Sequence, residues 1–287
     1  MARTLFIGID GGGTGCRARI EDDAGNVLGL GLAGPATSRL GLEKLWQSLA
    51  TAFGGAIAEA DLSPDEVAAM RAGIGIAGYG RKGFAEQLQA VRHPFAQAVY
   101  TSDAMAACVG AHGGADGGIV IIGTGSIGIA RVGGSELRVG GYGFPISDEG
   151  SGADLGLQAV RLALRAHDGR HEAGPLLRAV MARFADAPAD AVAWMDNATA
   201  TDYATLAPLV MRHADLGDPV GRRIVQNAAE QIDGLVRALL ERGAPRVALL
   251  GGLASAMEAW LAPDVRRRLS PPLGDAMSGA IALARAL

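Results

Sequence analysis

Two glycine-rich segments of the chain each lie between two short apolar runs. The first is FIGIDGGGTGCRARI, residues 6–20, and the second is IVIIGTGSIGIARV, residues 119–132. Each pattern predicts a strand, a tight turn and a second strand. Glycine lets a backbone approach an anion closely and direct N–H groups at it. The repeat therefore predicts two phosphate-binding turns, whose glycines are Gly11, Gly12, Gly13, Gly123 and Gly125.

A carboxylate stands directly before the first of these turns. Asp10 can hold a hydrated Mg²⁺, which binds through one or two carboxylates and substrate phosphates. A third glycine-rich strand end, Gly251 and Gly252, follows an apolar run late in the chain and could lie against an adenosine. The chain contains no Gly-x4-Gly-Lys-Ser/Thr motif. Backbone donors and Mg²⁺ must then carry the phosphate charge, and the pattern favours an enzyme that uses ATP.

Transfer of a phosphoryl group to an alcohol also needs a base that orients and deprotonates the hydroxyl. None of the five histidines lies in a glycine-rich strand end. Two carboxylates remain as candidates, Asp103 after the run AVYTS and Asp148 within GGYGFPISDEGSG. Each could instead be a helix N-cap, with Asp103 capping the helix that follows it and Asp148 or Glu149 capping a helix from Gly150.

The elements that position these residues follow from the hydrophobic pattern. Apolar spacing predicts a helix from about Leu42, and the capping box Ser63-Pro64-Asp65-Glu66 predicts a second. Residues 72–78 and 98–102 are expected to be buried strands, and catalytic side chains of α/β sheets lie at such strand ends. A boundary at 113–118 predicts two lobes, residues 1–114 and 115–287, each a mixed sheet with helices on its faces. The second lobe is helix-rich after Asp148, and the last helix is expected to pack on the first lobe.

Composition excludes several classes of protein. The 287 residues are 49% hydrophobic with a net charge of −4, and scattered basic residues give no footprint for nucleic acid. Cys16 and Cys108 have no ligand spacing and are expected to be buried thiols. No apolar run approaches the roughly 20 residues of a membrane span. We therefore expect a soluble, cytoplasmic protein with neither nucleic acid nor membrane as partner.

Several motifs together carry a resemblance to a known family. They are GIDGGGTGCRARI, TSDAMAACVGAH, IIGTGSIGI, GGYGFPISDEGSG and GDAMSGAIALA, which span almost the whole chain. In order and spacing the chain resembles the glucosamine and N-acetylglucosamine kinases of the BadF/BadG/BcrA/BcrD ATPase family. These kinases belong to the superfamily of acetate and sugar kinases, heat-shock chaperones and actin. The resemblance implies an α/β, two-lobed ribonuclease H-like (actin-like ATPase) fold with a central cleft.

The resemblance also implies roles for individual residues. ATP with Mg²⁺ and an amino sugar are the implied cofactors and substrate, and Asp103 is the implied base for the 6-hydroxyl. Asp10 would position Mg²⁺. The implied phosphate and adenosine contacts are Gly11, Gly12, Gly13, Thr14, Gly123, Thr124, Gly125, Ser126, Gly251 and Gly252. The implied sugar contacts are Thr37, Gly78, Asp103, Thr124, Gly141 and Asp148.

One position departs from the family pattern. In the loop GPATSRLG the family commonly has an asparagine that contacts the sugar, whereas this chain offers Thr37 and Ser38. A hydroxyl donates or accepts like an amide but is shorter. Glucosamine, N-acetylglucosamine and N-acetylmuramate therefore stay open as substrates, and so does a homodimer.

Two other functions are compatible with parts of this sequence pattern. An ATP-driven activator of a 2-hydroxyacyl-CoA dehydratase shares this fold, but holds an iron–sulfur cluster through a cysteine segment that this chain lacks. A sugar-sensing repressor would need a DNA-binding helix-turn-helix before the first strand, which begins near residue 4. The sequence therefore favours the kinase over both.

Overall fold

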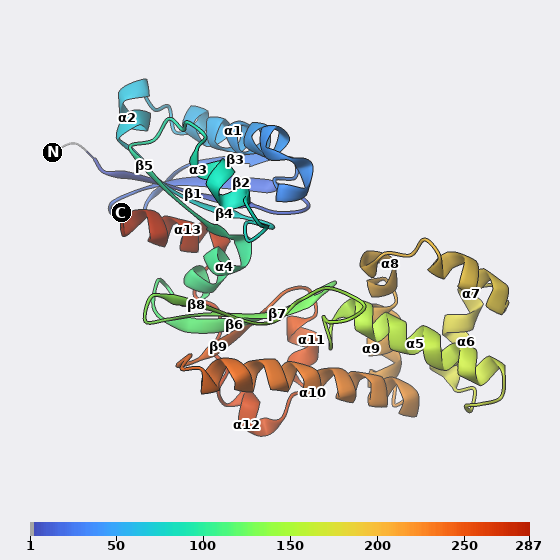
Figure 1. Ribbon diagram of the computed structural model, residues 1–287. Helices are drawn as coiled ribbons and strands as arrows, with labels where there is room; N and C mark the ends of the chain where they lie inside the picture. Colours follow the sequence, from blue (N-terminus) through green and yellow to red (C-terminus); the bar gives the residue numbers. More distant parts are fainter. Residues whose placement is uncertain (1–2) are drawn as a thin grey trace. The chain divides into compact units, whose positions relative to one another are not determined.

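The computed structural model describes residues 3–287 and divides into two compact units, each described here by itself (Figure 1). The first unit contains the residues up to Gly117 together with 130–136 and 271–287. The second contains 118–129 and 137–270. Within residues 3–287, no helix is both long enough and apolar enough to cross a membrane.

The first unit is built on a five-stranded sheet in the order β3-β2-β1-β4-β5. The first three strands form antiparallel hairpins, whereas β4 and β5 run parallel to β1. Their bounds are β1 Leu5–Gly11, β2 Cys16–Asp22, β3 Val27–Ala33, β4 Arg71–Ile76 and β5 Gln97–Ser102. The parallel strands bring three carboxyl ends to one edge of the sheet.

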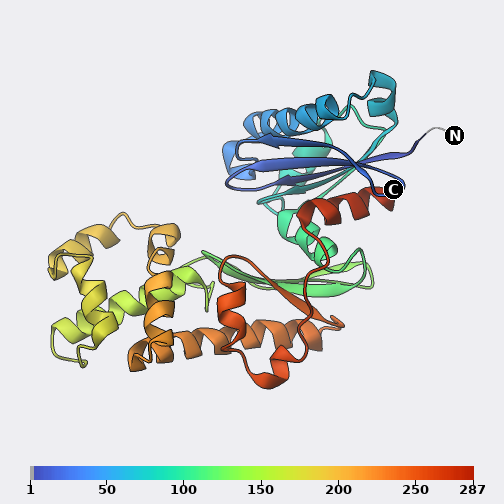
Figure 2. The same cartoon turned by 180° about the vertical axis from the view of Figure 1, so that it is seen from behind.

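Helices cover both faces of this sheet (Figures 1 and 2). The helix expected from Leu42 begins there, and the expected capping box of Ser63 and Glu66 opens the next one. The helices of the unit are η1 Ser38–Leu40, α1 Leu42–Glu59, α2 Pro64–Ala69, α3 Phe84–Gln89, α4 Asp103–Ala111 and α13 Ala276–Arg285.

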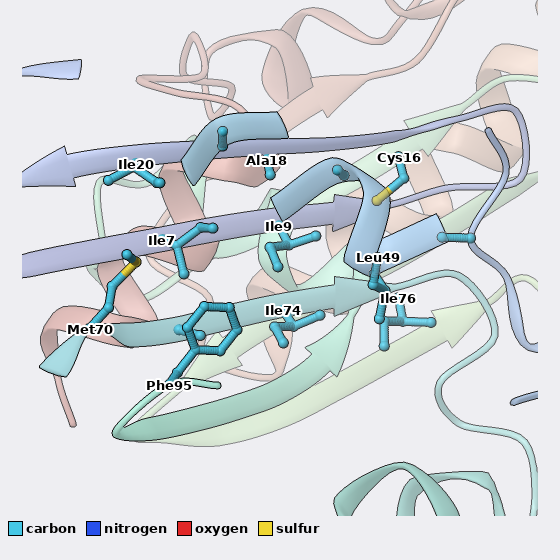
Figure 3. Close-up of a cluster of buried hydrophobic side chains, with 14 of the residues drawn as sticks. Ile7, Ile9, Cys16, Ala18, Ile20, Leu49, Met70, Ile74, Ile76 and Phe95 are labelled. Atoms are coloured by element: carbon cyan, nitrogen blue, oxygen red, sulfur yellow. The ribbon is translucent and has the colours of Figure 1, made fainter. Parts of the chain in front are cut away.

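The core of the first unit lies between the sheet and α1 (Figure 3). Alternate residues of β1 and β4 point to this side, among them Ile7, Ile9, Ile74 and Ile76, and Leu49 of α1 meets them. Each of these five side chains is at most 1% exposed. This two-residue period is what fixes the register of the strands against the helix.

The opposite face of the sheet contacts α13 at backbone distance. A Cβ atom added at Gly8 of β1 or Gly73 of β4 would collide with carbonyl oxygens of α13. Between the helices, a Cβ at Gly110 of α4 or Gly279 of α13 would collide with the backbone of the other segment. The last helix is therefore seated on the first unit by glycines that no larger residue can replace without a shift.

A second, four-stranded sheet has the order β8-β7-β6-β9, with β6 and β9 parallel. Most of it belongs to the second unit, whereas Gly117 and residues 130–136, at the end of β7 and the start of β8, are grouped with the first. The strands are β6 Gly117–Ile122, β7 Ser126–Val132, β8 Ser135–Gly140 and β9 Val247–Leu250. The long helix α10 packs on this sheet, since Leu239 lies against Gly128 of β7. The helices are α5 Gly152–His167, α6 Pro175–Ala182, α7 Pro188–Met195, α8 Ala200–Ala204, α9 Ala207–Asp215, α10 Pro219–Glu241, α11 Ala254–Glu258 and α12 Pro263–Arg266.

The seating of α13 yields a first prediction. Gly279→Ala should lower the free energy of unfolding by about 1–3 kcal/mol, because the new methyl group overpacks the contact with α4. Gly54→Ala in α1 is the matched control, since a Cβ there meets no atom within 4 Å. That substitution should raise stability by up to about 1 kcal/mol through helix propensity. Chemical denaturation of both variants decides the matter, and equal stability of the two would contradict the proposed contact.

Candidate active site

The residues expected to do chemistry in the first unit gather at the carboxyl edge of its sheet. Gly11 of β1 is in register with Ile76 of β4, and Ile76 with Ser102 of β5. Asp10 therefore lies one residue before this row and Asp103 one residue after it. The two carboxylates are close enough for the charge of Asp10 to act on the pKa of Asp103.

Asp103 does not cap the helix that follows it. Ser102 is the N-cap of α4, and its hydroxyl accepts a hydrogen bond from the amide of Met105 at 3.0 Å. Asp103 is the first residue of the helix, and its Oδ1 accepts from the amide of Ala104 at 2.9 Å. The capping role considered for Asp103 is thus wrong. Its carboxylate keeps a second oxygen that no backbone cap requires.

The electrostatic environment of Asp103 favours a carboxyl group that takes up a proton. Burial raises the pKa of this side chain above the ordinary value for aspartate, and the nearby charge of Asp10 raises the pKa further. The hydrogen bond from Ala104 acts in the opposite direction. A carboxylate with a raised pKa is a better general base near neutral pH.

Arg17 was not among the expected residues, although it pairs with one of them. Its guanidinium Nη2 lies 2.6 Å from Oδ2 of Asp10, whose side chain is 15% exposed, whereas that of Arg17 is 50% exposed. Asp10 and Arg17 are directly opposite in the β1–β2 hairpin. Counting the hairpin register from the glycine turn would have revealed this cross-strand pair. The carboxylate therefore has a cationic partner that is free to turn towards solvent.

The first glycine turn connects β1 to β2. The amide of Gly12 donates to the carbonyl of Gly15 at 2.9 Å, and the carbonyl of Gly12 accepts from Ala36 at 3.0 Å. Gly13 and Thr14 are exposed at the tip of the turn. A Cβ at Gly13 would meet no atom within 4 Å, so space remains beside the backbone there.

The loop that departs from the family pattern packs against the end of β4. Thr37 forms a bridge with Ala77, and its hydroxyl donates to the Ala77 carbonyl at 3.2 Å. The Ser38 hydroxyl is buried without a hydrogen-bond partner and lies against Gly78, where a Cβ would collide with it. The Thr37 hydroxyl is therefore used within the protein, and the adjoining Ser38 is held close to Gly78.

In the second unit, the expected residues also gather at one edge of a sheet. The turn 123–126 joins β6 to β7, and its carbonyls at Gly123 and Thr124 accept from the first residues of α5, Gly152 and Ala153. Thr124 is exposed at the tip. The Ser126 hydroxyl, in contrast, is buried and donates to the carbonyl of Glu149 at 2.7 Å. This side chain therefore ties the turn to the loop before α5.

Asp148 lies directly against this turn. A Cβ at Gly125 would come within 2.5 Å of the Asp148 Oδ2, so only glycine permits the approach. Burial raises the pKa of Asp148, which accepts from the Gly143 amide at 3.2 Å. Neither Asp148 nor Glu149 caps the following helix, as had been considered, because Ser151 is the N-cap of α5.

The remaining expected residues of this unit flank the turn. Gly251 follows β9 with φ of 97°, and a Cβ there would collide with the backbone of Ile122 immediately before the turn. Gly252 is exposed. Gly141, with φ of 70°, packs on Ile127 just after the turn. The structure thus brings Asp10, Thr37, Gly78 and Asp103 together in one unit, and the 123–126 turn, Gly141, Asp148 and Gly251 in the other.

Comparison with known proteins gives close relatives over nearly the whole length. The glucosamine kinase of Vibrio cholerae is 39% identical over 97% of this chain and 95% of its own. An N-acetylmuramic acid/N-acetylglucosamine kinase of Clostridium acetobutylicum is 30% identical over 82% of this chain and 79% of its own. A crystal structure from Chromobacterium violaceum, proposed to be an N-acetylglucosamine kinase, is 37% identical with a TM-score of 0.85, covering 98% of this chain and 99% of its own.

These relatives agree with the fold and with the motifs. Two sheets in an α/β arrangement, with the order β3-β2-β1-β4-β5 in the first unit, confirm the predicted ribonuclease H-like fold class. The family described as the BadF/BadG/BcrA/BcrD ATPases matches residues 7–280. This match includes every residue expected to contact nucleotide, metal or sugar. The chain is therefore a member of the BadF/BadG/BcrA/BcrD ATPase family.

Proposed function

We propose that this protein is a kinase that transfers the γ-phosphoryl group of ATP to the 6-hydroxyl of an amino sugar. The observation that carries this proposal is Asp103, a partly buried carboxylate with a raised pKa beside Asp10 at a sheet edge. Membership in an ATPase family and 39% identity to a glucosamine kinase support the same reaction. The chemistry and the relatives together favour an alcohol acceptor.

In the proposed reaction, Asp103 acts as the general base. Its free oxygen accepts the proton of the sugar hydroxyl while the hydroxyl oxygen forms a bond to the γ-phosphorus. The bond between that phosphorus and the bridging oxygen of ATP breaks, and ADP leaves. The hydrogen bond from the Ala104 amide holds the carboxyl group in one orientation, so that the other oxygen faces the substrate.

The residues at Asp10 fit a hydrated Mg²⁺. Among residues 3–287, no cluster of three or more His, Cys, Asp or Glu could hold a metal ion, so an all-protein cage is not the form of this site. One carboxylate together with substrate phosphates is the usual arrangement for Mg²⁺ in phosphoryl transfer. Bound Mg²⁺ would neutralise charge on the β- and γ-phosphates. Asp10 would hold it there.

The phosphates themselves would be held by backbone amides and by Arg17. The exposed tips at Gly13, Thr14 and Thr124 present backbone to a ligand, as in other glycine-rich anion sites. Arg17 is half-exposed beside Asp10 and can exchange its carboxylate partner for a phosphate. Gly251 and Gly252 would lie along the adenosine.

For the sugar, we propose glucosamine, with N-acetylglucosamine as the competitor and N-acetylmuramate as a further alternative. A free amine is cationic near neutral pH, and an ammonium beside Asp148 would offset the burial that disfavours its charge. Of the apolar side chains near it, Phe144 already packs on another ring and Tyr142 stacks with Arg138. An acetamide would therefore have to use the exposed Tyr142 ring, because Phe144 is engaged by its neighbour. The proposed setting for the enzyme is the cytoplasm.

The dehydratase activator is disfavoured by the environment of the cysteines. Both are buried, and burial raises the pKa of Cys16 to about 12 and that of Cys108 to about 11. Cluster ligation requires thiolates. Neither side chain is therefore disposed to ligate iron at a surface between subunits.

The role of Asp103 is tested by Asp103→Asn. This change should lower kcat by about 10²- to 10⁴-fold, the usual contribution of a positioned base, with a smaller effect on ATP affinity. Asp10→Asn should instead raise the Mg²⁺ concentration needed for half-maximal activity. Asp61→Asn, at an exposed position of the same unit, is the control. Steady-state kinetics check all three, and near-full turnover by Asp103→Asn would refute the assignment.

Asp103→Asn should raise the stability of the folded protein although it lowers the activity. Because the pKa of Asp103 is raised in the folded protein, its ionised form costs stability at pH above the unfolded pKa, near 4. Asp103→Asn should therefore raise the Tm at pH 8, while at pH values where the carboxyl is protonated in both states the gain should vanish. Melting curves across pH measure this. A lower Tm at pH 8 would show that the carboxylate is not penalised in the fold.

The sugar preference is tested by comparing kcat/KM for glucosamine and N-acetylglucosamine in a coupled ADP-release assay. We expect the larger value for glucosamine. A preference of more than about tenfold for the acetylated sugar, equivalent to roughly 1.4 kcal/mol in transition-state binding, would remove the glucosamine assignment. It would leave the kinase assignment intact.

A further inference from the structure

Four aromatic side chains of the second unit form a continuous row. Phe144 belongs to the loop that ends at Asp148, Tyr203 to α8, Trp194 to α7 and Phe184 to the turn after α6. Ring centroids are 5.1 Å apart for Phe144 and Tyr203, 4.7 Å for Tyr203 and Trp194, and 5.3 Å for Trp194 and Phe184. We call these residues the aromatic row. It connects the loop that carries Asp148 to the helical part of the unit.

Tyr203 is the fixed member of this row. It is 6% exposed. Its carbonyl lies so close to Gly156 of α5 that a Cβ on that glycine would collide with it. The capping box of Thr199 and Asp202 closes the start of α8, with the Thr199 hydroxyl 2.6 Å from the Asp202 carboxylate. The backbone that carries the Tyr203 ring is therefore held in place by α5 and by the cap of α8.

Phe144, in contrast, is a partly buried residue between two exposed apolar residues of its loop. Tyr142 and Ile146, on either side of it, are 70% and 85% exposed. Inside the loop, the Ser147 amide donates to the Gly143 carbonyl at 2.8 Å, and the Gly143 amide to Asp148 Oδ1 at 3.2 Å. These bonds bracket Phe144, so the position of its ring is coupled to the position of the Asp148 carboxylate.

We propose that Tyr203 is a positioning residue for sugar binding, which acts through Phe144 to hold Asp148 against the 123–126 turn. This inference rests on the proposed kinase function. Aromatic pairs at these distances have a preferred geometry, so the contact fixes a direction as well as burying surface. Replacing the ring frees Phe144 and loosens the loop. Asp103 and Asp10, the proposed base and the proposed magnesium ligand, lie in the other unit. The substitution therefore leaves their surroundings unchanged.

The test compares three substitutions in the full chain. Tyr203→Leu should raise the KM for glucosamine about tenfold, while kcat and the KM for ATP change less than threefold. Tyr203→Phe keeps the ring and should restore wild-type values. Phe184→Leu removes an aromatic from the far end of the row without touching Phe144, and is the control for general loosening. Calorimetric titration with glucosamine in the absence of ATP should give the same tenfold loss of affinity for Tyr203→Leu.

The outcomes separate this inference from the function beneath it. A wild-type protein that releases no ADP with any amino sugar would overturn the proposed function. An active wild type in which Tyr203→Leu keeps the sugar KM within twofold would overturn the positioning role alone. An equal rise in Phe184→Leu would also overturn it, because the effect would then be structural. If Tyr203→Leu does not fold, Tyr203→Met replaces the ring by a long, flexible side chain that fills irregular space and should show the same rise in sugar KM.

Discussion

The parallel pairing of β1, β4 and β5 is the constraint on which the chemistry of the first unit depends. It places the residue before one strand end and the residue after another, Asp10 and Asp103, at a single edge. At this edge the charge of Asp10 adds to the burial that raises the pKa of Asp103. Sheet register therefore sets where the acidic groups lie and brings the charge of Asp10 close to Asp103.

Small residues let neighbouring elements approach one another closely within each unit. Glycines in β1, β4, α4 and α13 allow helix and sheet backbones to touch, and Gly125 leaves room for the carboxylate of Asp148. Much of the high glycine content of the chain thus serves close approach between backbones and functional groups, in addition to turns. At these positions the space that a side chain would fill is taken up by a neighbouring backbone or by the Asp148 carboxylate.

The strands, the glycine turns and the principal helices could be predicted from hydrophobic periodicity and capping signals, because these are properties of neighbouring residues. The helix caps at Asp103 and Asp148 were predicted less well. In both places a serine nearby takes the capping position, Ser102 in one case and Ser151 in the other. The row of Phe144, Tyr203, Trp194 and Phe184 joins four separate segments and leaves no periodic signal in the sequence.

The division of labour between Ser102 and Asp103 has a consequence for how such chains diversify. The serine is the N-cap at the start of the helix, and the acidic side chain beside it adds one hydrogen bond, from the Ala104 amide. A duplicated gene could therefore lose the carboxylate in a single step and still encode a folded protein with its binding loops intact. With Asp103 in the role of base that we propose, a receptor or regulator that folds alike but lacks turnover is one codon change away from a catalyst built in this way.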